Sequence, residues 1–145
     1  MAKKILYVED HFNNMLLVKR IVQAEGHDFI TAADGENGRA MAVSEQPDLI
    51  FVDLRLPGDI DGFELLRQLK SHPELKEIPA VVLTAYGHGE AEVQARRSGC
   101  DGFLHKPADI QQVRAVIRQY VGQPTGQPAG SGSNNLERYG ISRSL

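Results

Sequence analysis

Five short apolar runs, each followed by a stretch of helical periodicity, constrain the fold of this chain more than any other feature of its sequence. The runs are rich in β-branched residues, as strands are, and cover 5–8, 29–32, 49–52, 80–83 and 102–104. The stretches that follow place apolar residues three and four positions apart, as amphipathic helices do, over 14–25, 35–44, 62–72, 90–98 and 109–121. The sequence therefore predicts five strands that alternate with five helices.

Regular alternation of strand and helix is typical of a parallel sheet with helices on both faces, because neighbouring parallel strands need crossover connections. The runs 49–52 and 80–83 are apolar without alternation, which indicates strands at the centre of the sheet, buried on both faces. We expect an α/β fold, a doubly wound five-stranded parallel sheet, over residues 1–121. Ligands bind such sheets at the carboxyl ends of the strands.

Residues 122–145 differ in composition from the rest of the chain. Residues 122–135 consist entirely of Gly, Gln, Pro, Ser, Thr, Ala and Asn, without apolar periodicity, which is typical of a flexible linker. The last ten residues contain too few apolar side chains to form a domain. With 145 residues in all, the chain has room for one domain of ordinary size and a flexible C-terminal tail.

Charge and cysteine content exclude several classes of function. The formal net charge of -3 lacks the basic excess that binding to nucleic-acid phosphates requires. The single cysteine, Cys100, can form no internal disulfide, which fits a reducing compartment. No apolar run approaches the roughly 20 residues of a membrane span, and the N-terminal run is too short for a secretory signal. We therefore expect a cytoplasmic protein without nucleic-acid or membrane partners.

Polar residues follow four of the predicted strands at their carboxyl ends, which meet at one edge of the sheet. They are Glu9 and Asp10 after the first strand, Asp53 after the third, Thr84 after the fourth and Lys106 after the fifth. Three carboxylates brought together repel one another unless a cation lies among them. Lys106 leaves two negative charges, which one divalent cation neutralises. Magnesium fits best, because it prefers oxygen ligands and often shares its coordination sphere with a phosphoryl group.

The same residues could carry out phosphoryl transfer. A carboxylate next to a metal, such as Asp53, can attack phosphorus and form an acyl phosphate. The Thr84 hydroxyl and the Lys106 ammonium would give the transferred group a hydrogen-bond donor and a positive charge. Each residue taken singly has an ordinary structural explanation, such as helix capping. Their joint position at the ends of four strands favours the chemical interpretation.

Five motifs in order, with the spacing of a known family, identify a resemblance. They occupy residues 5–10, 47–57, 61–62, 82–85 and 102–107. On these motifs the chain resembles the receiver domain of two-component response regulators, from residue 3 to about 121, and its opening motif is most similar to stand-alone, DivK-like receivers. The resemblance implies a flavodoxin- or CheY-like (βα)5 fold with strand order 2-1-3-4-5. It also implies a signalling protein that catalyses only its own phosphorylation and dephosphorylation.

The resemblance further implies a phosphoacceptor and a metal site. Asp53 would accept a phosphoryl group from a phosphohistidine on a sensor histidine kinase or a phosphotransfer protein. Mg²⁺ would be organised by Glu9, Asp10, Asp53 and the backbone carbonyl of Arg55. Lys106 would contact the phosphoryl group.

It implies a conformational switch as well. Thr84 would move toward the phosphoryl group, and Phe103 would turn inward into the space that opens. The fourth helix, fifth strand and fifth helix would then form the surface for a downstream protein partner. Arg55 and Tyr86 flank the route of attacking water in this family, and we predict that they tune the lifetime of the phosphorylated state.

The chain departs from the family pattern in two places. The segment 57–62 has one residue more than usual, and its extra carboxylate, Asp59, is expected to face solvent. Glu9 stands where aspartate is more frequent, and its longer side chain could reach the metal through water. Of the five histidines, His11 falls on a loop near the edge of the predicted site and is the candidate for mutation.

Other functions remain as alternatives. The main one is a degenerate receiver that binds a partner without being phosphorylated, against which the complete set of polar residues argues. A haloacid-type phosphatase needs a second acid two residues after its nucleophile, where this chain has Arg55. A flavodoxin-like flavin protein would bind phosphate after the first strand, where Glu9 and Asp10 would repel it. The motif of P-loop nucleotidases is absent from the sequence.

Overall fold

The fold is described by a computed structural model over residues 2–87, 89–122 and 142–143. The strands in these ranges are β1 (Lys4–Val8), β2 (Asp28–Ala32), β3 (Leu49–Val52), β4 (Ala80–Thr84), β5 (Gly102–His105) and β6 (Ser142–Arg143). The helices are α1 (Phe12–Ala24), α2 (Gly35–Glu45), α3 (Gly62–Ser71), α4 (Gly89–Arg97) and α5 (Ile110–Val121). All ten elements predicted from the sequence are therefore present, and their ends lie within two residues of the predicted ones.

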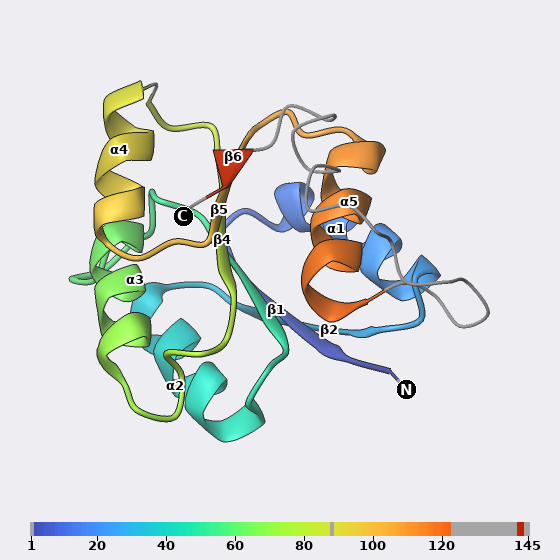
Figure 1. The fold of residues 1–145 in the computed structure, drawn as a ribbon, viewed down its shortest axis with the longest axis horizontal. Helices are drawn as coiled ribbons and strands as arrows, with labels where there is room; N and C mark the ends of the chain where they lie inside the picture. The colour runs from blue at the N-terminus through green and yellow to red at the C-terminus, as the bar shows by residue number, and fades with distance from the viewer. Residues whose placement is uncertain (1, 88, 123–141, 144–145) are drawn as a thin grey trace.

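The strands form one twisted sheet in the order β2-β1-β3-β4-β5-β6 (Figure 1). β1 to β5 are parallel, which confirms the predicted order 2-1-3-4-5. β6 is antiparallel to β5 and was not predicted, because two polar residues within a linker-like tail carry no strand pattern. Within the predicted flexible tail, residues 142–143 form this strand, whereas 123–141 and 144–145 lie outside the described part of the chain. The flexibility of the tail stays a prediction.

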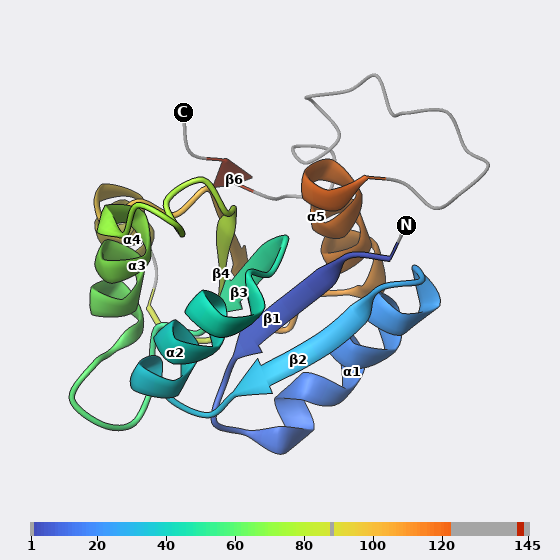
Figure 2. The ribbon, with the colours of Figure 1, turned by 90° about the horizontal axis from the view of Figure 1, so that it is seen from below.

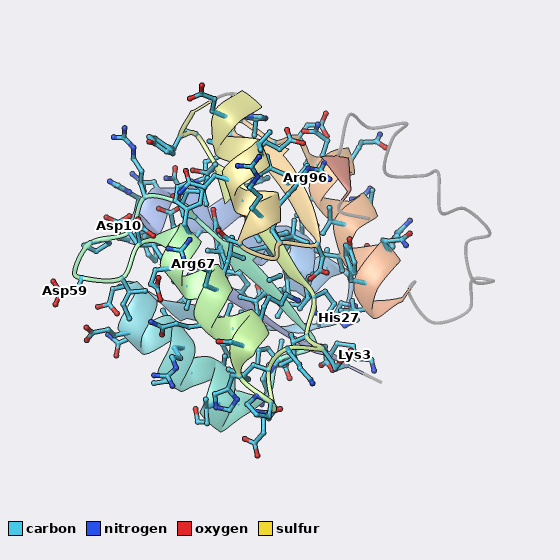
Figure 3. The ribbon with its side chains drawn as sticks, turned by 60° about the vertical axis from the view of Figure 1, so that its left-hand side comes forward. Lys3, Asp10, His27, Asp59, Arg67 and Arg96 are labelled. Atoms are coloured by element: carbon cyan, nitrogen blue, oxygen red, sulfur yellow. The ribbon has the colours of Figure 1, made fainter. Side chains whose placement is uncertain are left out.

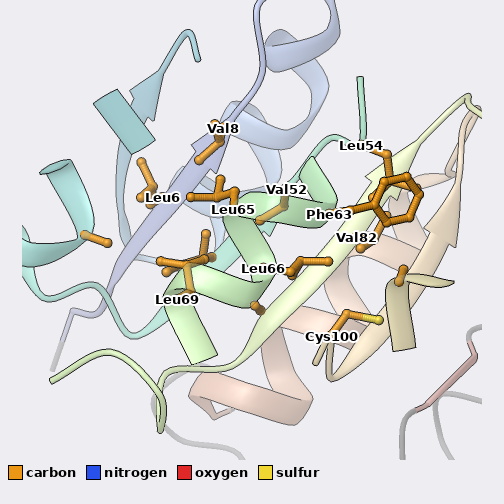
Figure 4. Packing of buried hydrophobic residues seen from close by; sticks show 14 of the residues in the cluster. Leu6, Val8, Val52, Leu54, Phe63, Leu65, Leu66, Leu69, Val82 and Cys100 are labelled. Atoms are coloured by element: carbon orange, nitrogen blue, oxygen red, sulfur yellow. The ribbon is translucent and has the colours of Figure 1, made fainter. Parts of the chain in front are cut away.

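Two hydrophobic cores lie on opposite faces of the sheet. α1 and α5 cover one face, and α2, α3 and α4 cover the other (Figure 2). The period of two along β1 divides its side chains between them: Ile5 and Tyr7 pack toward α1 and α5, whereas Leu6 and Val8 pack toward the other helices. Figure 4 shows the second of these cores, in which the leucines of α3 pack against the sheet.

The central strands β3 and β4 are buried along their whole length, as their continuous apolar runs predict. Because they pack on both faces, their carboxyl ends are held rigidly relative to those of β1 and β5. The turn after β3 is fixed further by α3, whose first residue, Gly62, donates its backbone N–H to the Leu54 carbonyl at 3.0 Å. Asp61 caps this helix by accepting from the Glu64 N–H at 2.8 Å. The fold therefore holds the loop after β3 in a defined position.

Candidate functional site

The polar residues that follow the predicted strands meet at the carboxyl edge of the sheet. Lys106 Nζ lies 2.5 Å from Glu9 Oε2 and 3.2 Å from Asp53 Oδ2. Thr84 Oγ1 donates to Asp53 Oδ1 at 2.7 Å. The residues directly after β1, β3 and β5 and the last residue of β4 thus each contribute one side chain to a single cluster. Asp10, the fifth predicted residue, lies next to Glu9 at the surface.

Asp53 is the centre of this cluster. Its Oδ1 accepts from the Thr84 hydroxyl and, at 3.1 Å, from the Arg55 backbone N–H, while its Oδ2 faces Lys106. The carboxylate is largely buried, yet it lines a cavity of about 410 Å³ together with Thr84 and Lys106. A small molecule or a transferred group can therefore reach the Asp53 carboxylate, whose two oxygens are already held in position by three donors.

The two buried carboxyl groups have pKa values shifted in opposite directions. Burial raises the pKa of Asp53, and the neighbouring Glu9 raises it further, against the Thr84 hydrogen bond and the Lys106 charge. Burial also acts to raise the pKa of Glu9, but hydrogen bonds with Asp53 and Lys106 outweigh it and hold that pKa below its ordinary value. The positive charge of Lys106 therefore does not fully compensate the negative charges of Glu9 and Asp53. Binding of a further cation beside these carboxylates would be favourable.

Glu9 of this cluster also belongs to a group of side chains that could hold a divalent cation. Within the described residues, ligand atoms of Glu9, Asp10 and His11 come within 4.8 Å of one another. His11 Nδ1 lies 3.0 Å from Asp10 Oδ1 and 3.3 Å from Glu9 Oε1. The carboxylate oxygens of Glu9 and Asp10 are ligands that suit a divalent cation that prefers oxygen. His11, which sequence analysis selected for mutation, is thus in contact with both acids.

Tyr7 and the His11 backbone are parts of the site that sequence analysis missed. The buried Tyr7 hydroxyl donates to Glu9 Oε2 at 3.2 Å, and the His11 N–H donates to Glu9 Oε1 at 3.1 Å. Burial raises the pKa of Tyr7, and the charges of Glu9 and Asp53 add to that effect. A signal was available, because Tyr7 stands two residues before Glu9 and the period of a strand places both on the same side.

Arg55 and Tyr86 lie together at the cavity. The Arg55 guanidinium carbon is 4.4 Å from the centroid of the Tyr86 ring, and both side chains line the cavity with Asp53. The Tyr86 ring also makes an edge contact with Phe63 of α3, with centroids 6.5 Å apart. The two residues that were predicted to flank the route of water therefore form one stacked pair.

The predicted switch residues already lie in an inward arrangement. Phe103 is only 2% exposed and belongs to the core beneath α3 and α4. The Thr84 hydroxyl already contacts Asp53. The movement that the family resemblance implies for Phe103 and Thr84 stays a prediction.

The longer loop after Asp53 places its extra carboxylate at the surface. Gly58 adopts a left-handed φ of 89° there, which admits the additional residue. Asp59 is exposed and points outward from the molecule (Figure 3). Its predicted orientation toward solvent is confirmed.

None of the helices in the described ranges is both long and apolar enough to cross a membrane.

Comparison with known proteins gives consistent results for sequence and structure. The sequence model of the response regulator receiver domain matches residues 5–118. The polar-differentiation response regulator DivK of Brucella anthropi is 32% identical over 122 residues, covering 84% of this chain and 98% of DivK.

Two solved structures are similar to this fold. The chemotaxis response regulator CheY4 of Vibrio cholerae superposes with a TM-score of 0.76 and 26% identity, covering 83% of this chain and 99% of that chain. The Mn²⁺-bound form of the response regulator Rcp1 superposes with a TM-score of 0.70 and 30% identity, covering 88% and 99%.

Proposed function

The chain belongs to the response regulator receiver domain family, and on this premise we propose that it acts as a response regulator that is phosphorylated on Asp53. The donor is a phosphohistidine on a sensor histidine kinase or a phosphotransfer protein. The observation that carries the proposal is the Asp53 carboxylate, which is held by Thr84, Lys106 and the Arg55 N–H and yet opens onto a cavity. An Asp53 oxygen forms the new bond to phosphorus, while the bond between phosphorus and the donor imidazole breaks and its electron pair returns to the ring nitrogen.

The neighbouring groups stabilise the charge that develops on the transferred phosphoryl oxygens. Lys106 provides a positive charge at 3.2 Å from Asp53, and Thr84 provides a hydroxyl donor. Glu9, Asp10, Asp53 and the Arg55 carbonyl would hold Mg²⁺, which when bound supplies further positive charge for the phosphoryl oxygens. The protein thereby promotes its own modification. Its output is a change of conformation that a downstream protein recognises, and we place this signalling in the cytoplasm.

Phosphorylation by a small donor tests the proposal directly. Incubation with acetyl phosphate and Mg²⁺ is expected to add one phosphoryl group, detectable by mass spectrometry of the intact chain. Asp53→Asn should abolish the adduct, whereas Asp59→Asn, which removes an exposed carboxylate from the next loop, should retain it. A parent protein that stays unmodified under these conditions would instead support the degenerate receiver.

An apolar surface beside the cavity suits the protein donor. On α1, Phe12 is 68% exposed, and Leu16 and Leu17 are exposed as well. Leu17 lines a second cavity of about 410 Å³ between α1 and the segment after β5, and Asn14 lines both this cavity and the one that contains Asp53. A helix of the donor that covers this patch would therefore bring its phosphohistidine to Asp53.

Phe12→Ala should slow phosphoryl transfer from a donor protein without slowing transfer from acetyl phosphate. We expect kcat/KM for transfer from a phosphorylated donor protein to fall about tenfold or more, since a buried Phe side chain contributes roughly 1.5–3 kcal/mol. The rate with acetyl phosphate should stay unchanged, because Phe12 lies outside the Asp53 cavity. Val93→Ala, which removes an exposed apolar side chain from α4, is the matched control. An equal loss with both donors would exclude a docking role for the patch.

The stacked pair of Arg55 and Tyr86 should slow hydrolysis of the phosphorylated state. Because the pair lines the cavity, it restricts the approach of water to the phosphoryl group. We expect Tyr86→Ala to accelerate dephosphorylation about two- to fivefold, the equivalent of ~0.5–1 kcal/mol of cation–π contact. Tyr86→Phe keeps the ring and should behave as the parent. Decay of the phosphorylated protein, followed by mass spectrometry, measures the rate, and a decay in Tyr86→Ala as slow as in the parent would contradict this role.

A further inference from the structure

The edge of β5 that faces away from β4 exposes backbone groups that another strand could pair with. Apart from β6, β5 is the last strand of the sheet, so the backbone N–H and C=O groups on its side away from β4 have no partner within the parallel sheet. Natural edge strands are usually protected from pairing with other chains by charged residues or proline. β5 begins with Gly102, Phe103 and Leu104, which are buried and uncharged. At the opposite edge, β2 begins with the exposed Asp28.

Two residues near the C-terminus pair with this edge. Ser142 and Arg143 pair with β5 in antiparallel orientation, Arg143 opposite Gly102 and Ser142 opposite Phe103, and β6 lies beside β5 in Figure 1. We propose that the β5 edge is a strand-docking surface and that its occupant is the chain's own C-terminal segment, 142–143, which we name the cap strand. Affinity in strand addition comes from backbone pairing, so the cap strand needs no apolar side chains.

Chain length favours an occupant from the same molecule. Nineteen residues, 123–141, separate α5 and its flanking Gly122 from the cap strand. At up to about 3.3–3.6 Å per residue, such a segment can span more than ~60 Å, whereas a domain of this size has a radius of gyration of about 13 Å. Pairing within one molecule does not depend on the protein concentration, whereas pairing with a second copy weakens on dilution.

The cap strand has two consequences. It blocks the β5 edge against a second copy of the chain, which would otherwise pair there. It also supports the strand that carries Phe103 and leads directly to Lys106. The proposal concerns the unphosphorylated chain and does not depend on the function of Asp53.

Hydrogen exchange in the full-length chain tests the cap strand. The variant Ser142→Pro/Arg143→Pro removes both amide protons of the strand, whereas Ser142→Ala/Arg143→Ala changes the same side chains and keeps both protons. We expect amide exchange in β5 to become at least tenfold faster in the proline variant and to match the parent in the alanine variant. Exchange in the central strand β3 should be the same in all three proteins. A synthetic peptide with the sequence of residues 136–145 should restore protection of β5 in the proline variant.

Two outcomes would overturn the proposal. Exchange in β5 that is equal in the parent and the proline variant would show that residues 142–143 do not protect the edge. Protection in the parent that falls on dilution, together with a dimer in sedimentation, would assign the occupant to a second copy. A monomeric parent with concentration-independent protection, and a proline variant that self-associates, would support a cap strand from the same chain.

Discussion

Lys106→Met is expected to lower the free energy of unfolding by about 3 kcal/mol at pH 7 and to slow phosphorylation of Asp53 about 10²-fold, because it leaves two acids without their cation. The Glu9 side chain is fully buried, that of Asp53 is 9% exposed, and Lys106 contacts both. Removing one member of a buried charge cluster is costly, since the remaining charges keep their desolvation penalty and lose their attraction. Urea denaturation and the rate of reaction with acetyl phosphate measure the two effects.

The stability loss should depend on pH with a definite sign. Burial and Glu9 already raise the pKa of Asp53, and loss of Lys106 raises it further. A carboxyl group whose pKa is higher in the folded state than in the unfolded state retains a proton that unfolding releases. The free energy of unfolding therefore falls as the pH rises from the pKa of the unfolded state to that of the folded state. The deficit of Lys106→Met should therefore be smallest below the ordinary Asp pKa of 3.8 and grow toward pH 7.

Two controls separate this effect from a general loss of charge. Lys4→Met removes a lysine whose Nζ lies 2.8 Å from Glu45 at the surface, and it should change stability little because water screens that pair. Mg²⁺ at a hundredfold excess over its dissociation constant should stabilise Lys106→Met by about 2.7 kcal/mol, since a bound cation replaces the missing charge. Equal losses of unfolding free energy in Lys4→Met and Lys106→Met would contradict the role of Lys106 as the charge partner of the two acids. A Lys106→Met protein that Mg²⁺ does not stabilise would contradict it as well.

The parallel sheet could be predicted because each strand carries its own signal. The runs that became β3 and β4 are apolar throughout, and those strands are buried on both faces. β6 could not be predicted in this way. Its stability depends on backbone groups of β5 that the parallel strands leave unpaired, and such groups leave no trace in the sequence of residues 142–143.

The sheet topology predicts that the site residues lie close together, but it does not predict the contacts between them. Strand ends in a parallel sheet meet at one edge, so Glu9, Asp53, Thr84 and Lys106 could be grouped from the sequence. Which oxygen accepts from which donor depends on side-chain conformation. For example, Glu9 Oε2 accepts from Lys106, whereas Glu9 Oε1 accepts from the His11 N–H. The stacking of Arg55 on Tyr86 joins two loops that are remote in sequence, and no local pattern predicts it.

Gly62→Ala is expected to destabilise the chain by about 3 kcal/mol and to displace the loop that carries Asp53. A Cβ atom at Gly62 would lie 2.3 Å from the Asp53 carbonyl oxygen and 2.5 Å from Leu54 Cα. Both are backbone atoms that no rotamer change can move aside. The first turn of α3 must therefore shift away from the end of β3, and the Gly62 hydrogen bond to Leu54 is lost with it.

Gly89→Ala provides the matched control for this steric argument. Gly89 also begins a helix, α4, but a Cβ atom there would meet nothing within 4 Å. Alanine favours helix over glycine, so this variant should be as stable as the parent or slightly more so. Because displacement of the Asp53 loop also disturbs the acceptor, Gly62→Ala should react more slowly with acetyl phosphate even at temperatures where it remains folded. Thermal unfolding and phosphorylation rates that are unchanged in Gly62→Ala would mean that α3 can move without disturbing Asp53.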